Sequence, residues 1–438
     1  MRILFIATRA PYGQMYGHKI AMRTYIRALK ALGHHVIIAA FAVPGETFDT
    51  EDLDTTTYYL PLPSRWTILT NIVKYWLPRR KSVNECLYLE QRTFQRVDEI
   101  CQTNGIELVV ADMVRTAACA EATGIPWVLD HDDLLSLRYR IWTKSASRKE
   151  NILGYLTGYL PNFIRPSIRW VFRLMLKREA ALLTRREVYW SDKARCSSLH
   201  SPSEVADLAS RTKGRVFCMP LTVAVPKNPA DNLSYRPISA VFTGGLTYQP
   251  NLDALRGYVE NVLPAFAQLG VEPPQLSVIG LCPDSLKARL AHPTIRFLGY
   301  VSDILDELKS HQVFFAPIVS GSGVKTKVLE AMACGLPVIA LPDAVSGISA
   351  EHMKHCLIAR DPEEFVQCYR LVNDNTTFAQ QVGLAGRELV IRSHSMEAAT
   401  KVLASELASV VRAMGRDRQP HTMSSATGEA QAAVYPVG

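Results

Sequence analysis

Two kinds of motif are missing from this sequence, and each absence excludes a class of protein. Its nine cysteines stand apart, and the closest pair, Cys356 and Cys368, is too widely spaced for a CxxC redox site or a zinc knuckle. We therefore expect reduced, mostly buried thiols, as in a cytoplasmic protein. No GxGxxG fingerprint follows either predicted first strand, which disfavours a NAD-dependent oxidoreductase.

Long apolar runs are also missing. The opening MRILFIATRA has an apolar run of only five residues, followed by Arg9 and Pro11, which is too short for the core of a signal peptide. We expect no export and predict a cytoplasmic location. Charges interrupt the apolar residues of segment 169–177 throughout, so a helix formed there cannot span a membrane.

The chain does have the size and composition of a two-domain globular protein, with 438 residues, of which 48% are hydrophobic and 21% charged. Its formal net charge is +8, and basic residues concentrate at 65–81 and 138–186, interleaved with tryptophans. Net charge alone does not distinguish a nucleic acid, a membrane surface and an anionic substrate. No nucleic-acid recognition motif accompanies the charge, so we expect no nucleic-acid partner.

Short apolar runs alternate with helical patterns along the chain. The run RILFIA at 2–7 predicts a buried strand, the apolar spacing over 18–32 predicts a helix, and 35–41 is again typical of a strand. The alternation recurs at 107–130 and after 240, which predicts an α/β fold with two Rossmann-like, doubly wound domains. The predicted parts are an N-terminal domain (1–225) with a basic helical insertion (about 134–186), a C-terminal domain (226–395), a helix able to pack back on the N-terminal domain (396–414) and a disordered tail (415–438).

The segment SGSGVKTKVLEAMACGLPVIAL at 320–341 carries the strongest functional signal. Its small residues let the backbone approach a ligand, Lys325 and Lys327 supply two positive charges, and Glu330 follows near the start of a helix whose N-terminus favours anions. Such a segment can hold a diphosphate while the carboxylate accepts hydrogen bonds from a ribose diol. An ordinary loop–helix–strand connection is the alternative, but Glu330 within the apolar stretch LEAMA needs a partner if it is buried.

This segment resembles the signature of group 1 glycosyltransferases, the large retaining family often numbered four. The similarity extends over most of the second domain, through FTGGLTYQPN at 242–251, SVIGLCP at 277–283 and FLGYVSDILDELKSHQVFFAP at 297–317. The resemblance implies the GT-B fold, in which two Rossmann-like domains face each other across the active-site cleft. It also implies metal-independent transfer of a sugar from a nucleoside-diphosphate donor, which is a co-substrate, so that no cofactor is expected.

The resemblance also assigns roles to residues. It makes Glu330 the ligand of the donor ribose, and it makes Lys325 and Lys327 the diphosphate ligands that stabilise its departure. The further donor-binding residues that it implies are Gly244, Gly245, Val301, Ser322, Gly323 and Val324. Ser322 stands where the family has the first glutamate of a pair, and Gly245 stands where many relatives have an arginine. The implied mechanism is front-face retention, in which the departing diphosphate takes the proton from the attacking hydroxyl.

In the first domain, PYGQMYG at 11–17 occupies the place of the family's glycine loop. Gly13 and Gly17 are therefore candidates for donor binding, although the spacing is not GxGxxG. Tyr12, His18 and Lys19 could line the cleft, but an exposed helix start fits each of them at least as well. His131 follows the strand PWVLD, where ligands approach a parallel sheet, and relatives carry a histidine there that contacts the transferred sugar. We take it as a candidate catalytic residue, with a purely structural histidine as the alternative. The aspartates beside it could suggest a divalent-metal site, but the resemblance is to metal-independent enzymes and we expect no metal.

A basic segment of the first domain raises the question of membrane contact. Arg169, Arg173 and Lys177 recur four residues apart with apolar residues between them. Such a helix can lie on an anionic membrane surface, which would suit a lipid-linked saccharide acceptor and association with the inner face of the cytoplasmic membrane. A helix packed on the first domain, with cations that extend to solvent, fits the pattern equally well.

Two other functions remain compatible with the sequence. A nucleotide-sugar 2-epimerase uses two such domains but needs further catalytic carboxylates and histidines, which we cannot assign. A non-catalytic nucleotide-sugar-binding subunit would fit the missing glutamate and arginine. The function we predict is retaining glycosyl transfer to a saccharide or lipid-linked acceptor, in the biosynthesis of a cell-surface polysaccharide or glycolipid.

Overall fold

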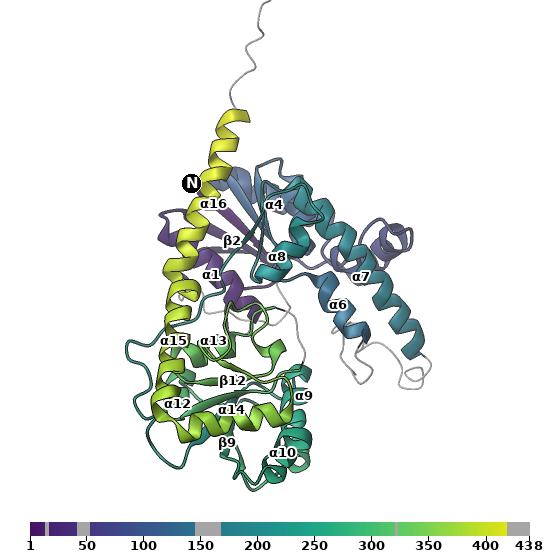
Figure 1. Ribbon diagram of the computed structural model, residues 1–438. Coiled ribbons are helices and arrows are strands. Elements are labelled where there is room, and N and C mark those ends of the chain that lie inside the picture. Colours follow the sequence, from purple (N-terminus) through teal and green to yellow (C-terminus); the bar gives the residue numbers. More distant parts are fainter. Residues whose placement is uncertain (14–16, 42–52, 145–167, 320–322, 418–438) are drawn as a thin grey trace, which may run out of the picture.

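The chain folds into two α/β domains joined by a long C-terminal helix (Figure 1). The computed structural model describes residues 1–13, 17–41, 53–144, 168–319 and 323–417. All nine cysteines lie within these ranges as free thiols. The predicted tail from 418 onward lies outside the described residues.

The N-terminal domain is built on a seven-stranded parallel sheet with the order β3-β2-β1-β4-β5-β6-β7. Its strands are β1 (Arg2–Ala7), β2 (His35–Phe41), β3 (Thr56–Leu60), β4 (Leu108–Asp112), β5 (Trp127–Asp130), β6 (Ser197–Leu199) and β7 (Val216–Cys218). Separate apolar cores cover the two faces of this sheet. Because both faces are buried, the central strands are continuous apolar runs, which is why they could be predicted.

Helices cover both faces of this sheet. They include α1 (Gly17–Ala31), α4 (Gln91–Asn104), α5 (Met113–Ala122) and α8 (Pro202–Ala209). Strands β3, β6 and β7 were not predicted. The last two are three residues each, which is too short to show a strand pattern.

The C-terminal domain has a six-stranded parallel sheet with the order β10-β9-β8-β11-β12-β13. Its strands are β8 (Ser239–Thr243), β9 (Gln275–Ile279), β10 (Ile295–Gly299), β11 (Val313–Ala316), β12 (Val338–Ala340) and β13 (Leu357–Ile358). Its helices are α9 (Gln249–Gly257), the π-helical turn η5 (Tyr258–Val262), α10 (Leu263–Gln268), α11 (Asp284–Arg289), α12 (Ile304–Lys309), α13 (Thr326–Ala333), the short 3-10 turn η6 (Pro342–Ala344), α14 (Pro362–Asp374) and α15 (Thr376–His394). Every strand predicted in this half is present, and the predicted fold class is confirmed.

Helix α16 (Met396–Asp417) leaves the C-terminal domain and packs on the N-terminal sheet beside α1 (Figure 1). Its apolar residues join the core that contains β1, and Arg215 pairs with Glu406 at 2.6 Å. The helix extends to Asp417, beyond the predicted end at Met414. Helix α16 therefore connects the two domains.

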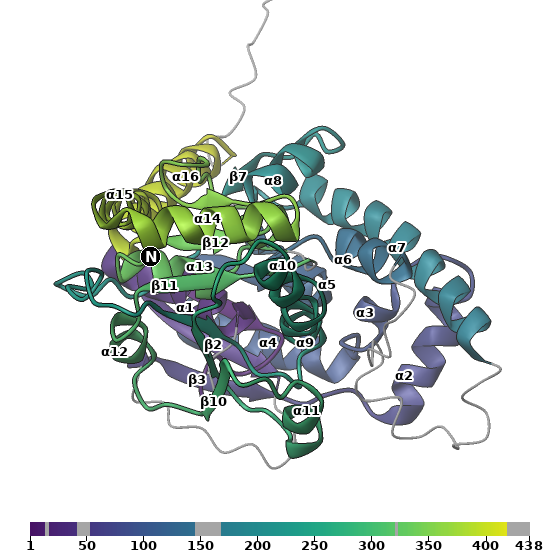
Figure 2. The ribbon, with the colours of Figure 1, turned by 60° about the horizontal axis from the view of Figure 1, so that its bottom comes forward.

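A group of helices projects from the N-terminal domain (Figure 2). We call it the helical arm, and it consists of α2 (Arg65–Asn71), the π-helical turn η2 (Ile72–Trp76), α3 (Val83–Cys86), α6 (Leu135–Lys144) and α7 (Ile168–Lys193). Helices α6 and α7 pack closely together. No described helix combines the length and apolar character needed to cross a bilayer.

Candidate active site

The carboxyl ends of the strands carry the candidate site residues in both domains. In each sheet the chain reverses its order of strands, between β1 and β4 in the first domain and between β8 and β11 in the second. Ligands of doubly wound sheets bind outside the strand ends at such a reversal. The loops after β1, β4 and β5 and those after β8, β9 and β11 therefore form the candidate site.

Lys327 lies against the end of β8. Its ammonium group donates a hydrogen bond to the amide oxygen of Asn251 at 2.5 Å and lies 5.0 Å from the centre of the Phe242 ring. Gly244 separates these groups: a Cβ added there would lie 2.5 Å from both Lys327 Nζ and Asn251 Nδ2. Only glycine leaves room for the lysine to approach the backbone so closely.

The backbone at the ends of β8 and β9 is equally crowded. Gly244 has a φ of +147° and Gly280 a φ of +131°, both in the region that favours glycine. A Cβ at Gly280 would lie 2.6 Å from the carbonyl carbon of Gly244. Gly245 has more room, because the nearest atoms would lie 3.9 Å away. The sequence reasoning missed Asn251 and Gly280, although both stand inside the motifs FTGGLTYQPN and SVIGLCP.

Burial shifts the pKa values of the lysines and the glutamate near the start of α13. Burial and, to a smaller extent, the charge of Lys325 lower the pKa of Lys327 to about 7, against the opposing charge of Glu330. Burial also raises the pKa of Glu330, which Lys327 only partly offsets. The two side chains are three residues apart on one helix face. These shifts favour an anion beside the lysines and hydrogen-bond donors beside the carboxylate.

Lys325 is the N-cap residue of α13 and donates a hydrogen bond to the Gly323 carbonyl at 2.6 Å. Burial lowers its pKa, while the charges of Asp343, Glu204 and Asp133 oppose the shift. Glu204 and Asp133 belong to the N-terminal domain, so Lys325 lies where the two domains meet. A Cβ at Gly347 would likewise lie 3.1 Å from Val324 and 3.2 Å from Ser201 Oγ, which shows how closely the domains approach here.

The opposite side of the site holds a buried ion pair. His18 Nε2 lies 2.8 Å from Asp112 Oδ1, and Asp112 also accepts hydrogen bonds from the backbone amide and hydroxyl of Thr8. Burial alone would lower the pKa of His18, but the charges of Asp112 and Asp132 outweigh it and the pKa is raised. The pKa of Asp112 is lowered because His18 and Thr8 outweigh its burial.

His131 points into the protein. It is 2% exposed, its Nε2 lies 2.9 Å from the hydroxyl of Ser191 on α7, and burial lowers its pKa to about 3. The imidazole is therefore neutral and has a partner inside the N-terminal domain. A contact with the transferred sugar stays a prediction for this residue.

Asp132, which follows β5, lies near His200, which follows β6. Asp132 has a φ of +61°, and its carboxylate lies 3.9 Å from both His200 Nε2 and Arg138 Nη2. His200 is buried, and its Nδ1 donates a hydrogen bond to the Met219 carbonyl at 2.8 Å. Its Nε2 has no hydrogen-bond partner in the described part of the chain. His200 was missed because β6 was not predicted.

The remaining predicted residues have simpler settings. Gly13 is exposed with a φ of +74°, and Gly17 opens α1. Val301 is half-buried after β10, beside the exposed Tyr300. Ser322 lies outside the described residues. Among the described residues there is also no group of three or more His, Cys, Asp or Glu side chains that could hold a metal ion.

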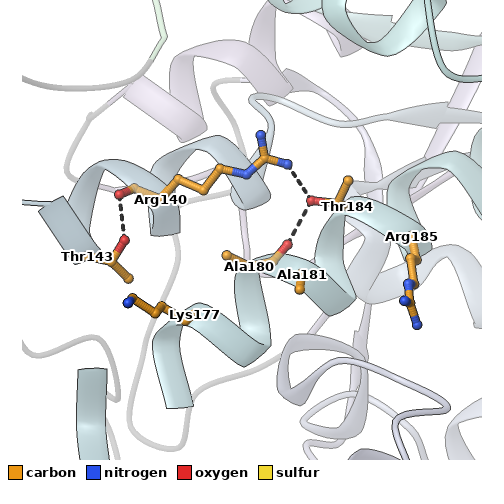
Figure 3. A pocket seen from close by; sticks show the side chains of 7 residues that line it. All are labelled: Arg140, Thr143, Lys177, Ala180, Ala181, Thr184 and Arg185. Atoms are coloured by element: carbon orange, nitrogen blue, oxygen red, sulfur yellow. Dashed lines mark hydrogen bonds between the residues drawn. The ribbon is translucent and has the colours of Figure 1, made fainter. Parts of the chain in front are cut away.

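A cavity of about 360 Å³ lies away from these strand ends, between α6 and α7 of the helical arm (Figure 3). Its lining includes Arg140, Lys177 and Arg185, and Arg140 donates a hydrogen bond to the Thr184 hydroxyl at 2.6 Å. None of the predicted site residues contributes to it.

Part of the C-terminal domain is similar to a known protein family. Residues 237–374 match the model of a family described as Glycosyl transferases group 1. No curated protein sequence is a significant match to the chain.

Solved structures match nearly the whole chain. Sucrose-phosphate synthase from Thermosynechococcus elongatus is 17% identical, with a TM-score of 0.66 over 94% of this chain and 99% of that one. Alr3699/HepE from Anabaena in complex with UDP is 12% identical, with a TM-score of 0.61 over 93% and 100%. The lipopolysaccharide outer core galactosyltransferase WaaB is 13% identical, with a TM-score of 0.59 over 93% and 99%.

The chain has the GT-B fold. At these identities the likeness shows the fold and leaves the chemistry to the residues. In a GT-B protein the strand ends of the two domains face a common cleft, which agrees with the influence of Asp133 and Glu204 on Lys325.

Proposed function

We propose that this protein is a retaining glycosyltransferase that moves a sugar from a nucleoside-diphosphate donor to a saccharide or lipid-linked acceptor. The observation that carries the proposal is the arrangement of Lys327, Gly244 and Asn251 at the end of β8, where a part-buried ammonium group meets a bare backbone. A part-buried cation whose hydrogen-bond partner is a neutral amide favours an anionic ligand. The match of residues 237–374 to group 1 glycosyltransferases supports the same assignment.

The donor half of the proposal rests on charge and geometry. Lys325 and Lys327 place two cations at the N-terminus of α13, where unpaired amides also favour anions. A diphosphate would neutralise both lysines, and a ribose diol would donate to Glu330. Structures of the Anabaena protein hold UDP and UDP-glucose, so a UDP-sugar is the first donor to test. The backbone near Val301 would contact the base, and Gly13 would approach the phosphate from the other domain.

The acceptor half involves the N-terminal domain. His18, Asp112 and Asp132 place a charged, partly accessible group opposite the donor residues. Such groups can orient an acceptor hydroxyl by hydrogen bonding. We assign the acceptor to the biosynthesis of a cell-surface polysaccharide or glycolipid, as the family resemblance suggests.

The reaction that we propose proceeds on one face of the donor sugar. The bond from the anomeric carbon to the diphosphate oxygen breaks, and the acceptor oxygen bonds to the same face. The acceptor proton passes to the departing diphosphate oxygen. Lys325, Lys327 and the amides of α13 stabilise the negative charge on that leaving group, so they take the part that a divalent cation would otherwise play.

The test is thermal stabilisation of the purified protein by UDP-, GDP-, ADP- and CMP-sugars, for the wild type and Glu330→Ala. We expect one nucleotide to raise Tm and the variant to lose that shift. Product analysis then separates transfer from simple binding and from epimerisation of the donor. An absence of any shift, or an unchanged shift in the variant, would contradict the proposed donor site.

A further inference from the structure

An apolar stripe lies exposed on the outer face of α2 and η2 in the helical arm. It consists of Trp66, Leu69, Val73 and Leu77, which are 78%, 51%, 56% and 51% exposed. Their spacing of three, four and four residues places them on one side of a helix. The stripe continues through the π-helical turn at Ile72–Trp76, which is closed by the hydrogen bond from Leu77 N to Ile72 O.

The opposite face of α2 and η2 packs against α7. Trp76 is buried and donates a hydrogen bond from its indole to Glu179 of α7 at 3.0 Å. The guanidinium of Arg178 lies 4.3 Å from the Trp76 ring and donates to the carbonyls of Trp76 and Leu77 at 2.6 Å. The stripe is thus held on a fixed support with its apolar side chains toward solvent.

Positive charge surrounds the stripe. The segment 61–84 contains five basic residues and no acidic residue. Of these, Lys74, Arg79 and Arg80 are exposed, and none of the three forms an ion pair with another described residue. The cationic cavity lined by Arg140 and Lys177 adds further positive charge to the same arm.

We propose that this face of the helical arm docks on an anionic lipid bilayer. A helix that presents tryptophan and aliphatic side chains within a basic surround can bury its apolar face at the headgroup boundary while its cations contact acidic lipids. Clusters of four to eight basic residues are typical of such surfaces. An acidic partner protein would use the charge, but it would not require an aligned apolar stripe of this kind.

The docking face differs from the one that the sequence suggested. The sequence left open whether segment 169–177 lies on a membrane or packs on the first domain. On α7, Leu176 is buried in the domain and Leu174 is 46% exposed, while the side chains of 168–173 lie outside the described residues. Helix α7 supports the arm, and the aligned apolar stripe belongs to α2 and η2 packed against it.

Vesicle binding tests this inference and needs no sugar donor, so its outcome is independent of the proposed transferase activity. The full-length protein is sedimented with vesicles of phosphatidylcholine alone and of phosphatidylcholine mixed with phosphatidylglycerol. We expect binding to the anionic vesicles only. The variants W66S/L69S/V73S and R79E/R80E should each weaken that binding about tenfold or more.

Two control variants make the same kinds of substitution on the surface of the C-terminal helices. The variant L384S/I391S/V411S replaces three exposed apolar residues of α15 and α16, and R370E/K401E makes the same change in net charge on exposed helical positions. Both should bind vesicles like the wild type, and all four variants should keep the wild-type Tm.

Three results would overturn the proposal. The first is a wild type that ignores anionic vesicles. The second is an equal loss of binding in the control variants. The third is a dimer abolished by W66S/L69S/V73S without any vesicle binding, because the stripe would then belong to a contact between two copies of this chain.

Discussion

Lys327 and Asn251 are 76 residues apart in the chain, yet the lysine ammonium and the amide oxygen lie 2.5 Å apart at the end of β8. The lysine is therefore held in place by a neutral group. A carboxylate at position 251 would hold it equally well but would also neutralise it. The hydrogen-bond partner of the ammonium group is a neutral amide, and Glu330 only partly offsets the effect of burial, so the pKa is lowered to about 7 and an anionic ligand would be favoured.

This relationship predicts that donor binding takes up a proton. Above pH 7 a fraction of Lys327 is neutral, and a bound diphosphate would raise its pKa and protonate it. Calorimetry of a UDP-sugar at pH 8, in two buffers of different ionisation enthalpy, should show uptake of up to about one proton. The affinity should also fall as pH rises from 7 to 9, by at most about tenfold per pH unit.

The control for this linkage is Asn251→Asp. Its carboxylate should keep Lys327 charged before the donor binds, so the proton uptake should vanish and the affinity should drop because the donor competes with an internal anion. Equal proton uptake in the variant and the wild type would show that another group titrates.

A second prediction separates the roles of Glu330 and Lys327. Glu330→Ala should weaken donor binding roughly 10- to 100-fold, because two hydrogen bonds to a charged acceptor are lost. Lys327→Ala should lower kcat by about 10² to 10³ with a smaller effect on affinity, because the charge it stabilises grows as the leaving group departs. Steady-state kinetics measure both, and Glu363→Ala on α14 is the matched control. Unchanged kinetics in both variants would remove the basis of the donor site.

A third prediction concerns the close backbone approach at Gly244. Gly244→Ala should destabilise the protein by about 1 to 3 kcal/mol and abolish donor binding, since the new methyl group would collide with Lys327 and Asn251 at a φ that alanine rarely adopts. Gly257→Ala on α9 meets nothing within 4 Å. It should leave binding intact and stabilise the helix by about 0.5 to 1 kcal/mol. Urea unfolding and donor titration test both variants.

A fourth prediction follows from the buried imidazole of His131. Its pKa in the folded protein, about 3, lies below the ordinary value of 6.5. As pH falls below 6.5, the histidine binds a proton in the unfolded chain but not in the folded protein. The free energy of unfolding therefore decreases between pH 6.5 and pH 3. Between pH 7 and pH 5 we expect a loss of about 2 kcal/mol from this residue, smaller in His131→Gln.

The same variant tests the proposed catalytic role. Transfer at the wild-type rate by a folded His131→Gln protein would assign the histidine to structure through Ser191. A large loss of kcat at unchanged Tm would instead support contact with the transferred sugar.

Strand β6 illustrates why part of the site could not be predicted. Its residues Ser197, Ser198 and Leu199 have no strand-like apolar pattern, and the strand exists because it pairs with β5 and β7. Ser198 Oγ donates to Asp130 at 2.8 Å, an interaction that only the assembled sheet creates. Because β6 was not predicted, His200 at its carboxyl end could not be recognised as a candidate site residue.

The proposed donor-binding residues could be predicted more completely from the sequence. Lys325, Lys327 and Glu330 lie within one short segment, so their proximity is local and follows from helical geometry. Asn251 and Gly280 follow different strands, and the chain connections after those strands bring both residues beside Gly244. Their spacing in the sequence does not predict that they lie close together.

The amino-acid sequence alone was enough to determine two doubly wound α/β domains and to predict an anion-binding segment at α13, because apolar periodicity and helix-terminal charge act over a few residues. The tertiary structure decided which groups face the cleft. It turned His131 inward to Ser191, placed Asp132 near His200, and brought Asn251 to Lys327. It also left Trp66 and its neighbours exposed on the helical arm. These outcomes depend on how distant segments pack. Whether a side chain is buried is decided by elements far away in the chain, which the residues next to it in the sequence do not specify.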